Sequence, residues 1–171
     1  ANPDKKCNKS RNICIARSRP LRYNKRNRIP IKREELELIL MKYALIGCGR
    51  ISPNHIGSAL DHKLDIRAVC DRKEEKAAAL LQRYGLQNVK IYTDYRKMMD
   101  EVNPELVAVA TESGYHPDIA IDCIRHGCNV IIEKPLALSM ADARRVIAAR
   151  DEMGVVAAVN QQNRFNAPIR L

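Results

Sequence analysis

Short β-rich runs alternate with helical runs from residue 42 to residue 161 of this 171-residue chain. The β-rich runs occupy residues 42–47, 64–71, 89–94, 105–111, 129–135 and 155–161. The helical runs between them occupy residues 52–62, 73–85, 95–102, 116–127 and 139–154. This alternation predicts an α/β fold, a doubly wound parallel sheet with helices on both faces. Aromatic residues make up only 4% of the chain, so Ala, Val, Ile and Leu must fill its core.

The first 40 residues differ from the rest of the chain in charge. They carry 12 Lys and Arg against 4 Asp and Glu, a net charge of +8, whereas residues 41–171 carry 18 against 16, a net charge of +2. No apolar periodicity runs through this leader, so we expect residues 1–40 to be disordered apart from a short helix over 33–42. Met41 is a candidate for the natural start. A basic arm could bind nucleic acid, but Tyr23 is its one aromatic residue, so it lacks the rings that stack on bases and we expect no nucleic-acid partner.

The sequence contains no apolar run of 18 residues and no secretion signal, so we expect no membrane segment. None of the six cysteines lies in a C-x-x-C pair, and no His/Cys cluster has the spacing of zinc ligands. We therefore expect reduced thiols, no metal site and a cytoplasmic location. The six cysteines are Cys7, Cys14, Cys48, Cys70, Cys123 and Cys128.

A glycine-containing turn, "GCGRIS" at residues 47–52, follows the first predicted strand. Its first glycine would permit a tight exit from the strand, and its second would let the backbone approach a pyrophosphate. The helix that begins near Ser52 would direct its free N–H groups and its positive dipole end at the phosphates. Taken alone, such a run could also be a tight turn that binds no ligand. The candidate cofactor-binding residues of this turn are Gly47, Cys48, Gly49, Arg50 and Ile51.

Asp71 ends the second predicted strand, 19 residues after Ser52. A carboxylate at this place would accept hydrogen bonds from the adenosine ribose hydroxyls of a dinucleotide. Taken alone, Asp71 could equally cap the helix that follows it. Its charge would repel a 2′-phosphate, which favours NAD over NADP, although Arg72 beside it could bind such a phosphate and make NADP acceptable.

Four segments together are similar to the Gfo/Idh/MocA family of sugar dehydrogenases and oxidoreductases. The segments are "ALIGCGRISPNHI" at 44–56, "AVCD" at 68–71, the stretch 107–143 with its T-x-x-x-x-H and E-K-P motifs, and "NQQNRFNAP" at 160–168. The resemblance covers residues 42–171. It implies an NAD(P)-dependent dehydrogenase built from an N-terminal Rossmann domain, over residues 41–160, and a C-terminal sheet domain that holds the sugar. We expect the full-length protein to be a homo-oligomer.

The resemblance also implies roles for particular residues. Lys134 of the E-K-P motif would lie near the nicotinamide and the substrate hydroxyl, and Glu133 would lie beside the nicotinamide ribose. The loop after the fourth strand would line the cofactor cleft, and Glu112 stands there where the family usually has proline. The remaining residues that the resemblance assigns to the cofactor are Thr111, Ser113, His116 and Arg164.

Chemistry gives Lys134 independent interest, because a lysine at the end of a buried strand is costly unless it has a partner or a function. Desolvation and Glu133 could tune its pKa for acid–base work, and the alternative is a structural ion pair with Glu133. His116 alone would more often be a first-turn helix residue than a catalyst, so we expect it to contact cofactor or substrate and not to transfer a proton.

The run "NQQNRFNAP" narrows the resemblance to the UDP-N-acetylglucosaminuronate 3-dehydrogenases of bacterial surface-polysaccharide synthesis. Residues 161–171 would be the start of the second domain, so we expect a chain that binds a dinucleotide and is inactive alone; the family's catalytic histidine and most sugar contacts would follow residue 171. Two competing hypotheses remain: a non-enzymatic dinucleotide-binding module or inactive fragment, and a nucleic-acid binder that depends on the basic leader.

Overall fold

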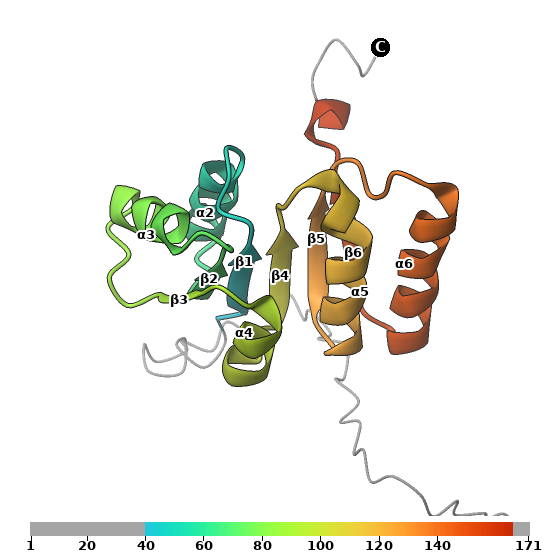
Figure 1. Ribbon diagram of the computed structural model, residues 1–171, viewed down its shortest axis with the longest axis horizontal. Coiled ribbons are helices and arrows are strands. Elements are labelled where there is room, and N and C mark those ends of the chain that lie inside the picture. Colours follow the sequence, from blue (N-terminus) through green and yellow to red (C-terminus); the bar gives the residue numbers. More distant parts are fainter. Residues whose placement is uncertain (1–39, 166–171) are drawn as a thin grey trace, which may run out of the picture. The chain divides into compact units, whose positions relative to one another are not determined.

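The computed structural model describes residues 40–165, which form a six-stranded, entirely parallel sheet in the order β3-β2-β1-β4-β5-β6 (Figure 1). The strands are β1 Lys42–Ile46, β2 Asp65–Cys70, β3 Lys90–Tyr92, β4 Leu106–Val109, β5 Asn129–Glu133 and β6 Ala157–Asn160. The helices are α2 Ser52–Asp61, α3 Glu74–Arg83, α4 Tyr95–Val102, α5 His116–Arg125 and α6 Met140–Met153, with 3₁₀ turns η1 Ser113–Tyr115 and η2 Gln162–Phe165. The predicted doubly wound α/β fold is confirmed, and every strand and helix expected after residue 42 is present.

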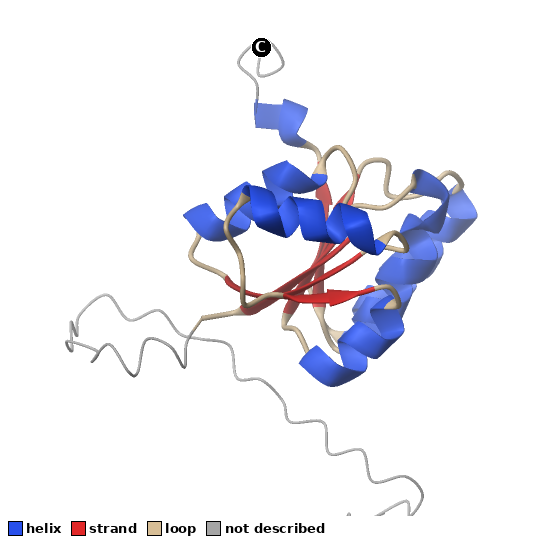
Figure 2. Ribbon diagram, turned by 60° about the vertical axis from the view of Figure 1, so that its left-hand side comes forward, coloured by secondary structure: helices blue, strands red, loops and turns tan. Residues whose placement is uncertain are grey.

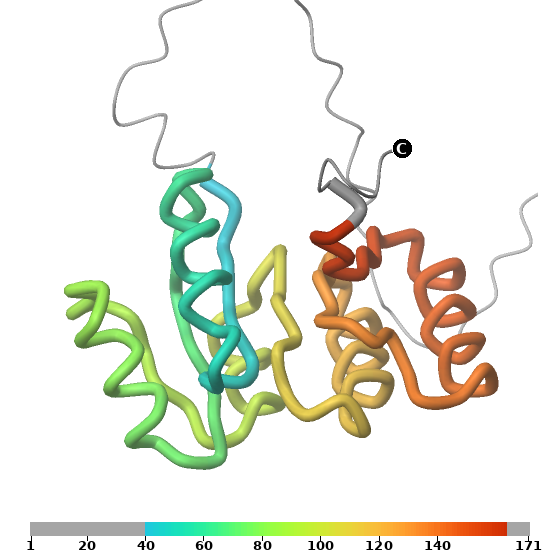
Figure 3. Tube along the Cα trace, turned by 90° about the horizontal axis from the view of Figure 1, so that it is seen from above, coloured from blue at the N-terminus to red at the C-terminus, as the bar shows by residue number. Residues whose placement is uncertain are grey.

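The strand order reverses its direction at the pair β1–β4. The chain moves outward from β1 to β3 on one side, then returns and moves from β4 to β6 on the other, which is the order of dinucleotide-binding Rossmann domains. Figure 3 shows the two halves side by side, the earlier in blue to green and the later in yellow to red. Because all strands are parallel, their carboxyl ends and the loops that follow them meet at one edge of the sheet.

Helices cover both faces of the sheet, as Figure 2 shows. Side chains of β1 alternate between the two layers: Tyr43 and Leu45 pack with α2 and α3, whereas Ala44 and Ile46 pack with α4, α5 and α6. Small and branched aliphatic side chains dominate both clusters, as the low aromatic content requires. Burial on both faces fixes the register of the central strands.

The helix ends follow local sequence signals. Ser139 caps α6, its hydroxyl accepting the Asp142 N–H at 3.0 Å, and Gly154 ends the helix in the left-handed conformation at φ +66°. The helix therefore lies within the range 139–154 expected from the sequence. Asp94 caps α4 in the same way by accepting the Arg96 N–H at 2.9 Å.

The leader expected over residues 1–40 lies outside the described residues apart from Leu40, and so does most of the short helix expected over 33–42, whose last residue, Lys42, opens β1 instead. Cys48, Cys70, Cys123 and Cys128 are all free thiols, as expected, whereas Cys7 and Cys14 fall outside the described part of the chain. No helix within residues 40–165 is both long and apolar enough to cross a bilayer.

Candidate functional site

The glycine turn after β1 passes directly over the end of β4. Gly47 has φ +97°, its N–H donates to the Cys70 carbonyl at 2.8 Å, and an added Cβ would lie 2.4 Å from the Ala110 carbonyl oxygen. No side chain fits in that space, and the dihedral itself disfavours L-residues. The sequence therefore has glycine here because the turn must cross the switch point of the sheet at van der Waals distance.

The second half of the turn leaves its backbone donors available. Within residues 40–165, the N–H groups of Gly49, Arg50 and Ile51 have no hydrogen-bond acceptor, and α2 begins without a capping side chain or an acidic residue in its first turn. An added Cβ at Gly49 would meet no protein atom within 4 Å, so this side of the turn is open. Free N–H groups at a helix N-terminus bind anions such as a pyrophosphate.

Ser52 stands where the usual fingerprint has a third glycine. Its side chain is buried, and its hydroxyl donates to the Gly49 carbonyl at 2.6 Å. The hydroxyl therefore turns back into the turn and closes it, while the small side chain lets α2 pack on the sheet. Serine can therefore take the place of glycine at this position.

Asp71 links the second strand to the glycine turn. Its Oδ2 accepts the Cys48 N–H at 2.8 Å, and its Oδ1 accepts the Lys73 N–H at 2.9 Å. The alternative of a helix cap is not what the structure shows, because α3 begins at Glu74 with Lys73 as its N-cap and no side-chain capping bond. The carboxylate is thus held beside the turn that offers N–H groups to phosphate, and each oxygen keeps a lone pair for a ribose hydroxyl.

Cys48 lies in the turn but offers no reactive sulfur. Burial, followed by the Asp71 charge, raises the pKa of its thiol to about 12. The side chain is 7% exposed and packs with the α2–α3 layer. Its contribution to the site is therefore its backbone N–H, and the thiol acts as a small apolar group.

Arg72 reaches from the end of β2 to the loop that follows β4. Its Nη2 lies 3.7 Å from Glu112 Oε2, and its guanidinium lies 5.4 Å from the centroid of the Tyr115 ring. Both side chains of the ion pair are 75% exposed. Glu112, the residue that departs from the family pattern, is therefore the ion-pair partner of the arginine next to Asp71.

The β4–α5 loop carries three of the predicted cofactor residues, and they differ in exposure. Thr111 and Ser113 are half-buried near the carboxyl edge. His116 is only 1% exposed, and its Nδ1 and Nε2 face the carbonyl oxygens of Pro135 and Thr111 at 2.8 and 2.9 Å. Both ring nitrogens thus face backbone carbonyl oxygens, so His116 links the loops after β4 and β5, and its expected contact with cofactor or substrate stays a prediction.

Glu133, the last residue of β5, is buried in a polar network that the sequence did not reveal. Its Oε1 accepts from His55 Nε2 at 2.9 Å and from Asn160 Nδ2 at 2.6 Å, and its Oε2 faces the Lys134 N–H at 3.3 Å. Glu133 and His55 are 5% and 8% exposed. The network ties α2, which follows the glycine turn, to the ends of β5 and β6.

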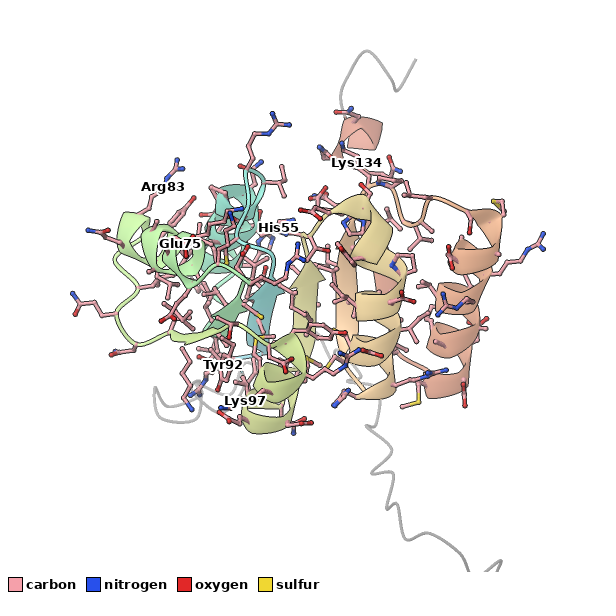
Figure 4. All side chains as sticks on the ribbon, in the orientation of Figure 1. His55, Glu75, Arg83, Tyr92, Lys97 and Lys134 are labelled. Carbon is pink, nitrogen blue, oxygen red and sulfur yellow. The ribbon has the colours of Figure 1, made fainter. Side chains whose placement is uncertain are left out.

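Lys134 lies beyond the end of β5 and is exposed (Figure 4). The expectation that Lys134 lies within the buried end of a strand is therefore wrong: the strand was predicted to run through residue 135 but ends at Glu133. The alternative ion pair with Glu133 is not formed either, because among the described residues that carboxylate is bonded to His55 and Asn160. The ammonium group is free to meet a ligand at the carboxyl edge.

His55 is the site residue that sequence reasoning missed, whereas Asn160 opens the segment 160–168 that the sequence had singled out. His55 lies on the buried face of α2 with Ser52, Ile56 and Ala59, which is the one signal that could have singled it out. Arg164 lies in η2, and its side chain is outside the described part of the structure. Among residues 40–165, no group of three His, Cys, Asp or Glu residues could hold a metal ion.

These features together define the class of protein. The chain has a glycine turn with free N–H groups at a helix N-terminus, an aspartate at the end of the next strand, and both at the switch point, which are the features of a dinucleotide-binding Rossmann domain. The residues present fit the cofactor, since the open side of Gly49 can take the pyrophosphate and the Asp71 oxygens can take the ribose.

Comparisons with known proteins agree with this class. Residues 41–161 match the oxidoreductase family with an NAD-binding Rossmann fold, Gfo/Idh/MocA, and the chain belongs to that family. It is 33% identical over 130 residues to D-apiose dehydrogenase of Paraburkholderia graminis, covering 75% of this chain and 34% of that protein. It is 29% identical over 127 residues to D-glucoside 3-dehydrogenase of Escherichia coli, covering 73% of this chain and 36% of that protein.

Solved structures show the same likeness. The WlbA dehydrogenase from Bordetella pertussis, in complex with NADH and UDP-GlcNAcA, is 34% identical with a TM-score of 0.71, covering 77% of this chain and 40% of that one. The chain therefore spans little more than a third of the length of these relatives. It is an NAD-binding Rossmann domain of a family that contains sugar dehydrogenases.

Proposed function

We propose that this chain is the cofactor domain of an NAD-dependent dehydrogenase that oxidises a secondary hydroxyl of a sugar or nucleotide sugar. The observation that carries the proposal is the hydrogen bond from the Cys48 N–H to the Asp71 carboxylate, 2.8 Å long. It holds the group that would bind the adenosine ribose against the turn that would bind the pyrophosphate, so the two ends of one ligand are recognised together.

The order of the binding groups along the carboxyl edge of the sheet gives the direction in which a bound dinucleotide would lie. Asp71 would fix the adenosine end, the N–H groups of residues 49–51 would fix the phosphates, and the ends of β4 and β5 would lie at the nicotinamide end. When bound, NAD supplies the acceptor for a hydride that leaves a carbinol carbon. The chain's own groups bind and orient the two reactants.

Lys134 is the residue that we propose at the reacting carbon. It is exposed and follows β5, the neighbour of β4 in the sheet, so its ammonium can donate a hydrogen bond to the substrate oxygen. That bond stabilises the alkoxide character that develops as the hydroxyl proton leaves. The resemblance implies that a histidine of a second domain takes the proton.

The substrate class is supported by relatives and not by the described residues. The Bordetella structure contains UDP-GlcNAcA, and the run "NQQNRFNAP" at 160–168 is similar to that subgroup. We propose a nucleotide-sugar substrate, a role in surface-polysaccharide synthesis, a cytoplasmic location and a homo-oligomeric full-length enzyme on these grounds. A non-enzymatic dinucleotide-binding module is the second candidate.

Turnover tests the proposal in a chimera in which residues 42–171 replace the corresponding domain of the Bordetella relative. We expect oxidation of UDP-GlcNAcA with NAD, and we expect Lys134→Met to lower kcat about 10²–10⁴-fold with little change in the affinity for NAD, because the methionine keeps the stem but not the ammonium. Lys97→Met is the matched control, since Lys97 on α4 lies at the opposite end of the sheet (Figure 4).

Two outcomes would contradict this role for Lys134. Unchanged turnover in Lys134→Met would remove the residue from the chemistry. Weak NAD binding with normal turnover at saturation would make it a cofactor anchor. A chimera that binds NAD but oxidises no hydroxyl, with or without Lys134, would favour the non-enzymatic module.

A further inference from the structure

The loops after β2 and β4 contact each other across the end of β1. β1 lies between β2 and β4 in the sheet, so a contact between the two loops must pass over the glycine turn. Arg72 makes that contact twice, through Glu112 at 3.7 Å and over the Tyr115 ring at 5.4 Å. Both partners come from the β4–α5 loop, so the guanidinium is directed toward that loop.

The Arg72 contact with the β4–α5 loop lies next to Asp71. Asp71, held by the Cys48 and Lys73 N–H groups, is the residue proposed to bind the adenosine ribose hydroxyls, and Arg72 follows it directly. The ribose oxygen that carries the extra phosphate in NADP would therefore lie beside Arg72. An arginine in this position can bind a 2′-phosphate in bidentate fashion only if its guanidinium is available.

We propose that Glu112 is a cofactor-specificity residue that acts through Arg72. Glu112 holds the guanidinium on the β4–α5 loop, away from a 2′-phosphate, and so selects the dinucleotide that lacks this group. The inference rests on the proposed cofactor site and adds to it a residue outside the glycine–aspartate fingerprint.

The charges of the cluster favour the same discrimination. Glu112 adds a second carboxylate to the surroundings of Asp71 and pairs with the Arg72 guanidinium, so a 2′-phosphate with a charge near −2 would meet two carboxylates and a guanidinium that is already engaged. Removing the Glu112 charge would take away one of these carboxylates and free Arg72. Because the pair is exposed, its loss should hardly affect folding, which separates the effect on specificity from an effect on stability.

The test is calorimetric titration of the 171-residue chain with NADH and with NADPH at low ionic strength. We expect Glu112→Gln to tighten NADPH binding about three- to tenfold, the size of one unit charge a few ångströms away in a setting that is largely screened by solvent, and to change NADH binding less than twofold. Added salt should shrink the gain. Glu152→Gln, an exposed carboxylate on α6, changes the net charge equally and should leave both affinities unaltered.

A double variant isolates the role of Arg72. In an Arg72→Met background, Glu112→Gln should give a clearly smaller gain in NADPH affinity, because the cation that it frees is gone and only its direct repulsion of the phosphate is removed. A gain of the same size in that background, or an unchanged NADPH affinity in Glu112→Gln alone, would overturn the inference while leaving the cofactor site intact. Failure of the unmodified chain to bind either dinucleotide would instead overturn the proposed function itself.

Discussion

At the scale of single residues, the site depends on positions where the backbone leaves little choice. Gly47 combines a positive φ of +97° with a carbonyl oxygen 2.4 Å from where a Cβ would stand. The sequence pattern predicted a tight turn at this glycine. It could not predict the contact with Ala110, because the two residues are distant in sequence. At Gly49, by contrast, an added Cβ would meet no protein atom within 4 Å, and we predict that the bound ligand is the reason for this glycine.

Gly47→Ala should lower the free energy of unfolding by about 2–4 kcal/mol, from the left-handed dihedral and the forced displacement of β4 together. Urea denaturation measures this loss of unfolding free energy. Gly57→Ala is the matched control: this glycine lies inside α2, and its added Cβ would come no closer than 3.8 Å to another group, so alanine should be neutral or stabilising by up to about 1 kcal/mol. Equal effects of the two variants would mean that the turn can move off β4.

At the scale of secondary-structure elements, local patterns were enough to predict each strand and helix, because alternation and helical periodicity lie within a few residues. They could not predict the network that joins the elements. His55 and Glu133 are 78 positions apart, and only the folded sheet brings α2 against the end of β5. The sequence placed the end of β5 two residues too late, and this had a larger consequence. Lys134, expected within a buried strand, lies after the strand and is exposed.

His55→Leu should lower the free energy of unfolding by about 1.5–3 kcal/mol, because it removes a hydrogen bond to a buried carboxylate that keeps Asn160 and the Lys134 N–H as its remaining partners. His62→Leu controls for loss of a histidine, as His62 is exposed and bonded to the Ser58 carbonyl on its own helix. If both variants denature at the same urea concentration, the Glu133 network does not hold α2 to the sheet.

At the scale of the whole described domain, the strand order creates the site. The reversal at β1–β4 places the glycine turn, Asp71 and the β4–α5 loop at one edge, although they come from three separate parts of the sequence. The alternation of elements and the fingerprint residues predicted this arrangement. The Arg72–Glu112 contact and the bracing by His116 could not be predicted, because each depends on how two loops meet in space.

The most direct test of the account is the choice between NADH and NADPH by the 171-residue chain, measured by calorimetry. We expect NADH to bind more tightly than NADPH. Asp71→Asn should weaken NADH binding and narrow the difference between the two affinities. The amide keeps an oxygen for the Cys48 N–H but loses the charge that receives the ribose hydroxyls and repels a 2′-phosphate. Tighter binding of NADPH by the unmodified chain, or a preference for NADH of undiminished size in Asp71→Asn, would contradict the assignment of Asp71 as the group that recognises the cofactor.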